Sequence, residues 1–271
     1  MEFAQIATIA GKEFWDRIRN RWVLAVALVF TAFALSIAYF GAAQQGSVGF
    51  RSIEVTIASL VSLVIYLVPL IALVLGFDAI VGERERGSLD LLLSMPITRF
   101  ELLLGKYLGL AAALTFSTVA GFGLVGMVLA AQLDLNALFH YFGFMLSSVL
   151  LGCAFLSLAV MVSVFAADRT RASGLAIALW FFFVLIFDLL LLGALVITGG
   201  QSGGELFPYL LLANPADVFR ILNIFSLEDV RTLYGLATVF PPALARPQLL
   251  GAVMFAWIAL PLAIAAWKFR K

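Results

Sequence analysis

Residues Gly82–Lys106 read GERERGSLDLLLSMPITRFELLLGK, a charged stretch set between two long apolar runs. The runs cover 56–81 and 103–131, and each exceeds the roughly 20 residues that a helix needs to cross a bilayer. Thr98–Glu101 has the T-x-x-E form of a capping box, which marks the start of a helix. The chain is therefore expected to leave the membrane, form one short helix at its surface, turn at Pro96 and re-enter.

Composition places the whole chain in the membrane class. Hydrophobic residues make up 63% of the 271 residues and charged residues only 12%, and the mean hydropathy is +1.09. A soluble domain would be roughly half apolar and a quarter charged. We predict an all-α membrane protein, a single transmembrane domain over 1–271, with six spans near 22–42, 56–81, 103–131, 136–166, 172–197 and 248–267.

The basic residues predict the orientation. With the N-terminus in the cytoplasm, 13 of the 17 Lys and Arg residues fall on the cytoplasmic side, where such residues are enriched. Both termini are therefore expected inside, in the inner membrane of a bacterial cell. The basic residues are spread along a membrane face rather than clustered with aromatics, which argues against a nucleic-acid partner.

Two further segments are expected to form helices outside the spans. Residues 1–21 have helical amphipathic spacing, which favours an interfacial helix over a simple basic flank. Residues 198–247 form a long loop on the outer, periplasmic side, in which Asn214, Pro215 and Asp217 suit a helix start and Ser226 a second one. A periplasmic partner could dock on this loop, or its helices could lie on the lipid or cap the spans. The candidate docking residues are Asn214, Asp217, Phe219, Ile221, Leu222 and Phe225.

The sequence contains no recognisable nucleotide-binding or catalytic motif. Gly105-Lys106 is followed by Tyr107, so there is no nucleotide-binding loop, and no nucleophile–base pair is visible. The chain is expected to be non-catalytic, with no cofactor or metal of its own, and to take energy from a partner or an ion gradient. Asp188, the acid well inside a span, could fix helix packing or carry a proton or substrate. Met127, Met145, Met161 and Cys153 could be copper ligands, but such residues also fill apolar gaps.

The segment 82–101 with its flank resembles the signature of the ABC-2 type transporter permeases, roughly E-R-E-x-G-[ST]-L-[ED]-x-L-L-x-x-P-[IV]-x-R. The matching residues are Glu83, Arg84, Glu85, Gly87, Ser88, Leu89, Asp90, Leu92, Leu93, Pro96, Ile97 and Arg99, with Leu102 and Lys106 after them. The resemblance implies that the short helix is a coupling helix, seated in a groove of a separate ATPase that binds ATP and Mg. It also implies a working unit of two permease copies and two ATPases.

The coupling helix is expected to cover Ser88–Met95, between the charged turn and Pro96. Leu89, Leu92 and Leu93 would fill the ATPase groove, and the charged residues would orient the helix and form ion pairs at the rim. Those charged residues are Glu83, Arg84, Glu85 and Arg86, with Asp90 within the helix.

The run NPADVFRILN at 214–223 resembles, more narrowly, one branch of that family, which serves the maturation of nitrous oxide reductase in denitrifying bacteria. This resemblance implies a periplasmic copper-handling partner, to which the permease would pass ATP-driven motion. Two alternatives stay open: an ABC-2 exporter of a lipid, drug or polysaccharide, and an ion-coupled secondary transporter.

Overall fold

The computed structural model describes residues 3–19, 21–40, 53–130, 135–197, 207–224, 244 and 246–270. These ranges are mostly helical, and they contain no strand. In chain order the helices are α1 (Phe3–Arg19), α2 (Trp22–Phe40), α3 (Ile53–Gly76), α4 (Val81–Glu85), α5 (Ser88–Leu93), α6 (Arg99–Ala130), α7 (Leu135–Phe165), α8 (Arg169–Phe181), the π-helical turn η2 (Phe182–Ile186), α9 (Phe187–Ile197), α10 (Phe207–Leu211), α11 (Pro215–Ile224) and α13 (Pro247–Arg270).

The predicted membrane class and all-α fold are confirmed. Five helical segments in the described ranges are long and apolar enough to cross a membrane, beginning at Ile57, Arg99, Leu138, Arg169 and Pro247. A sixth is obtained if α1 and α2, which meet at an angle of 64°, count as one bent pair. That α1 is an interfacial helix apart from a first span over 22–42 stays a prediction.

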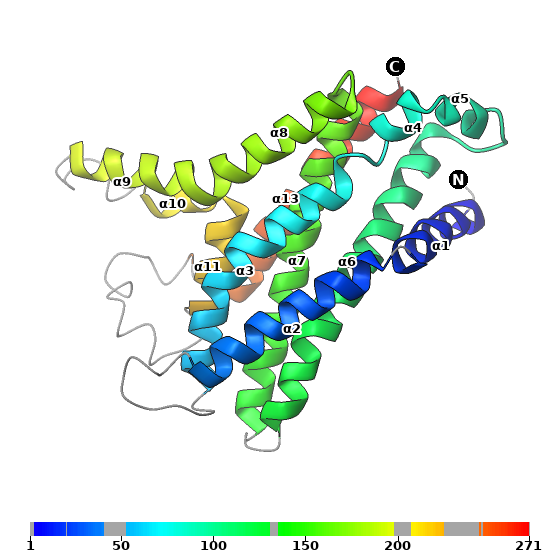
Figure 1. Ribbon diagram of the computed structural model, residues 1–271. Coiled ribbons are helices and arrows are strands. Elements are labelled where there is room, and N and C mark those ends of the chain that lie inside the picture. The colour runs from blue at the N-terminus through cyan, green and yellow to red at the C-terminus, as the bar shows by residue number, and fades with distance from the viewer. Residues whose placement is uncertain are drawn as a thin grey trace.

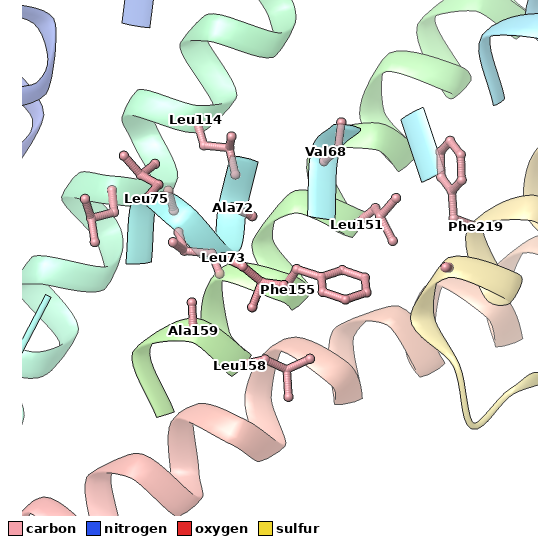
Figure 2. Close-up of a cluster of buried hydrophobic side chains, with 14 of the residues drawn as sticks. Val68, Ala72, Leu73, Leu75, Leu114, Leu151, Phe155, Leu158, Ala159 and Phe219 are labelled. Carbon is pink, nitrogen blue, oxygen red and sulfur yellow. The ribbon is translucent and has the colours of Figure 1, made fainter. Parts of the chain in front are cut away.

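The core forms where α3, α6 and α7 pack together. Figure 2 shows Val68, Leu114, Leu151 and Phe155 of these helices meeting in one apolar cluster, with Phe219 of α11 beside them. These side chains are almost fully buried. The long α7 lies at the centre, because it packs against α3, α6, α11 and α13.

Figure 1 shows α1, α4, α5 and the C-terminal end of α13 at one end of the molecule. Helix α1 packs along α6 at the G-x-x-x-G pair Gly105 and Gly109. A Cβ added to Gly105 would lie 2.7 Å from the Cβ of Ile9, and one added to Gly109 would lie 2.6 Å from the carbonyl oxygen of Ala10. The absence of side chains at these two positions is therefore what lets α1 approach α6 closely.

The segment formed by α8, η2 and α9 leans away from the bundle in Figure 1, and most of its apolar side chains are exposed. The π-helical turn interrupts the regular hydrogen-bond pattern of this span at Phe182–Ile186. Such turns leave a backbone carbonyl in need of another donor, and in this protein α11 supplies it, as described below.

Candidate functional site

The coupling segment, defined as residues 82–101, is held at its start by another helix. The backbone N–H groups of Ile80 and Val81 both donate to Ser163 Oγ of α7, at 2.9 and 3.0 Å. These donors sit at the N-terminal end of α4, where a helix has no intrahelical partners for them. The hydroxyl of a core helix therefore fixes where α4 begins.

The turn between α4 and α5 needs a glycine. Gly87 has a φ of +71°, in the left-handed region that L-residues rarely adopt. After α5 the chain passes Pro96 and reaches the predicted capping box, which is confirmed. Thr98 Oγ1 accepts from the Glu101 N–H at 3.2 Å, and a Glu101 carboxylate oxygen accepts from the Thr98 N–H at 2.9 Å.

Lys106 joins three helices through two carboxylates, of which Glu13 is buried and Glu83 is half-buried. Its Nζ lies 2.8 Å from Glu83 Oε1 on α4 and 3.2 Å from Glu13 Oε2 on α1. Lys106, on α6, is only 6% exposed. Solvent therefore screens the ion triad of Lys106, Glu13 and Glu83 only weakly. Arg17 adds a second cation to Glu13 at 3.0 Å, and a polar hollow of about 580 Å³ adjoins the triad.

The next charged residues bind the ends of other spans. Arg84 donates to the carbonyl oxygens of Ala166 and Val164, at 2.9 and 3.2 Å, at the end of α7. Glu85 Oε1 accepts from the Arg169 N–H at the start of α8, at 2.8 Å. These are contacts to helix termini, where the N–H and carbonyl groups need outside partners.

Glu83, Arg84 and Glu85, predicted to orient the short helix and to form ion pairs at the rim of a partner's groove, all have contacts within the chain itself. Their contacts are to α6, α7 and α8 of the same chain, because the segment folds back onto the ends of the spans. Arg86 differs: it lies 3.6 Å from Glu83, and its side chain is largely exposed. The charged turn thus serves mainly to attach the coupling segment to the helices behind it.

Helix α5 turns different leucines outward from those predicted. Leu89 is only 8% exposed and belongs to the core, while Leu92 and Leu93 pack partly against it. Leu91 is 66% exposed and Met95, just beyond the helix, is 50% exposed. Leu91 was missed by the sequence reasoning, although its spacing of four residues from Met95 would have placed the two on one helical face.

Helix α11 lies among the spans rather than apart from them. It packs against α3, α7, α13 and η2. The predicted N-cap at Asn214 is confirmed, since its Oδ1 accepts from the Ala216 N–H at 3.0 Å. The Asn214 Nδ2 donates to the Phe183 carbonyl oxygen at 2.8 Å, and so pairs a backbone acceptor within η2.

Most of the docking residues predicted on the outer loop are buried within the chain itself. Phe219 is fully buried beside Phe144, and Asn214, Asp217 and Ile221 are also buried. Leu222 packs partly against the same core. Phe225 and the predicted helix start at Ser226 lie outside the described residues. For 207–224, the structure agrees with the alternative that this segment covers the spans.

Asp188 forms an interhelical ion pair. Its Oδ2 lies 3.0 Å from Arg220 on α11, and Arg220 also contacts Asp217 at 2.5 Å. This contact agrees with the first of the two roles considered for Asp188, which was to fix helix packing. The charge count places Arg220 on the outer side but does not identify it as the partner of Asp188. The two residues lie 32 positions apart, and no local sequence pattern links residues at that distance.

Asp217 gives this cluster a pH dependence. Burial raises the pKa of Asp217, Arg220 opposes this and the Asp188 carboxylate adds to it, so that the pKa rises from 3.8 to about 7. The folded state then holds a proton that the unfolded state releases above pH 3.8. Stability contributed here is present below that pH and is lost as pH rises through about 7.

Replacing Asp217 by asparagine is expected to flatten the fall of the unfolding temperature between pH 4 and pH 7 in detergent, because the side chain no longer titrates. Asp16→Asn is the matched control, since Asp16 is an exposed acid paired with Lys12. An unchanged slope in Asp217→Asn would show that another group controls this pH range.

Comparison with known proteins adds family information. A family model described as "ABC-2 family transporter protein" matches residues 7–271. A protein of Stutzerimonas stutzeri named "Probable ABC transporter permease protein NosY" is 43% identical over 271 residues, which cover 98% of each chain. A protein of Pseudomonas aeruginosa with the same name is 44% identical over 268 residues, which cover 97% of each chain.

Proposed function

Because this chain belongs to the ABC-2 family of transporter proteins, we propose that it is a permease subunit moved by a separate cytoplasmic ATPase. That ATPase, similar to the one called NosF, would bind ATP and Mg and hydrolyse the nucleotide. The permease itself would be non-catalytic and embedded in the bacterial inner membrane with both termini in the cytoplasm.

One observation carries this proposal: α5 has an exposed apolar face, and the residues just before α5 contact several spans. Leu91 and Met95 offer an apolar contact surface, and residues just before them bind α6, α7 and α8. A force applied at α5 would therefore reach these helices directly, through short contacts rather than through a flexible loop. Such a link is what a partner needs in order to push on membrane helices.

We further propose that two copies of the chain form the membrane part of the complex, in maturation of the copper site of nitrous oxide reductase. This rests on the likeness to the two NosY relatives. The motion would pass to a periplasmic copper-handling protein similar to NosD. In the described ranges no group of three or more His, Cys, Asp or Glu residues lies together as a metal site would require.

The test is a bacterium that makes nitrous oxide reductase and lacks its own copy of this permease. The purified reductase is expected to lack most of its copper, and expression of this chain should restore it, as measured by elemental analysis of the enzyme. A second periplasmic copper enzyme, purified from the same cells, serves as the control for general copper supply. A fully copper-loaded reductase in the deletion strain would contradict the maturation role and leave the family membership standing.

A further inference from the structure

A second feature of the coupling end is a small polar hollow on the inward side of α5. Its volume is about 290 Å³, and three cationic side chains from three separate helices line it: Arg84 of α4, Arg99 of α6 and Lys268 of α13. Asp90 is the one acid in the lining, so an excess of two positive charges remains. The composition of the hollow therefore favours an anion.

The two arginines are held in place by hydrogen bonds that use only some of their N–H groups. Arg84 uses two N–H groups in its bonds to the end of α7, and Arg99 uses one in its bond to the Phe269 carbonyl oxygen at 3.1 Å. A guanidinium has five N–H groups, so in the described part of the chain both arginines keep donors beyond these bonds. The Phe269 ring lies 5.7 Å from the Arg99 guanidinium carbon and orients it further.

Lys268 is oriented by an aromatic ring. Its Nζ lies 5.9 Å from the centre of the Phe165 ring at the end of α7, and no hydrogen bond to Lys268 occurs among the described residues. An ammonium carries three donors on a flexible stem. It can therefore meet an anion in the hollow without breaking a contact that the fold requires.

The depth of the hollow points to the membrane surface. It lies where α7 and α13, both long enough to span, come to an end. Trp267, adjacent to Lys268, is 60% exposed, and tryptophan is enriched at the level of the lipid headgroups. Basic pockets between spans at this level are suited to the phosphate of an anionic lipid.

We propose that this hollow binds the phosphate group of an anionic phospholipid, in the leaflet that faces the coupling segment. The lipid would join α4, α6 and α13 by charge, next to Leu89 and Leu93, and so support the inward side of α5. This binding does not depend on an ATPase or on copper chemistry. It can therefore be tested with the permease alone.

The experiment uses the full-length chain in bilayer discs of phosphatidylcholine, with or without phosphatidylglycerol. Native mass spectrometry counts the phosphatidylglycerol molecules that stay bound as lipid is stripped away. The wild type is expected to retain this lipid, and Lys268→Gln should weaken its retention by roughly fivefold, the effect of one basic residue near an anionic surface. The double change Arg99→Gln, Lys268→Gln should weaken it by about 25-fold if the two effects add.

Arg171→Gln is the matched control, because Arg171 is an exposed basic residue near the same end that lies outside the hollow. Equal lipid loss in this control would overturn the proposal. Inorganic phosphate added to phosphatidylcholine discs distinguishes a free anion from a lipid: if it raises the unfolding temperature as much as phosphatidylglycerol does, the lipid assignment is wrong. Loss of a co-expressed ATPase from Lys268→Gln, with lipid retention unchanged, would assign the hollow to the partner protein instead.

Discussion

Replacing Leu91 and Met95 by aspartate is expected to release the cytoplasmic ATPase while the permease still inserts in the membrane. Both side chains lie outside the core at the free face of α5. Central apolar groups in an interface commonly contribute about 2 kcal/mol or more each, so loss of even one should weaken binding by roughly 30-fold. Co-purification of the two subunits, followed by a binding titration in detergent, measures the effect.

Two controls separate this surface from its surroundings. Ser94→Asp adds a charge at the end of α5 without removing an apolar contact, and should leave most binding intact. Leu89→Ala should instead lower the stability of the permease, because Leu89 is buried in the core. If the ATPase stays bound to the Leu91→Asp, Met95→Asp variant, α5 is not the docking helix.

Replacing Lys106 by methionine is expected to destabilise the permease by about 3–5 kcal/mol, the usual effect of removing one partner of a buried ion pair. The buried Glu13 would then keep only Arg17 as a cationic partner, and the half-buried Glu83 only the exposed Arg86. Unfolding in a denaturing detergent series measures the loss. Lys12→Met is the matched control, because its exposed pair with Asp16 should contribute no more than about 1 kcal/mol.

Neutralising the two acids tests the cause of that loss. Adding Glu13→Gln and Glu83→Gln to Lys106→Met should recover much of the stability, since no uncompensated buried charge is left. If Lys106→Met costs no more than Lys12→Met, the triad does not hold α1 and α4 to α6.

The sequence was sufficient to predict the membrane class, the helical fold and a short helix between two spans near Ser88. The reason is that long apolar runs and the Thr98–Glu101 capping box are local features whose physical meaning hardly depends on the rest of the chain. The same holds for the N-cap at Asn214, which the structure confirms.

The faces of the short helices could not be predicted in the same way. In α5 the run LDLLL is apolar at most positions, so periodicity does not distinguish the buried Leu89 from the exposed Leu91. In α11 the sequence indicates an apolar face but does not show what covers it. Phe219 packs on the chain's own α7, and a sequence pattern cannot tell whether such a face is covered by the same chain or by another protein.

Charged contacts between segments distant in sequence were the hardest feature to predict. Arg220 pairs with Asp188 and Arg84 with the end of α7, across 32 and 82 residues. Charge counts place such residues on one side of a membrane on average, but give no information on which helix end or carboxylate a given arginine contacts.

The ion triad at Lys106 also constrains how the protein is made. Glu13 leaves the ribosome 93 residues before Lys106, which at about 5–20 residues per second is a delay of roughly 5–20 seconds. During that time α1 lacks both the lysine and the glycine seam of α6 on which it packs. Helix α1 can therefore take its final place only after α6, which ends at Ala130, has been synthesised.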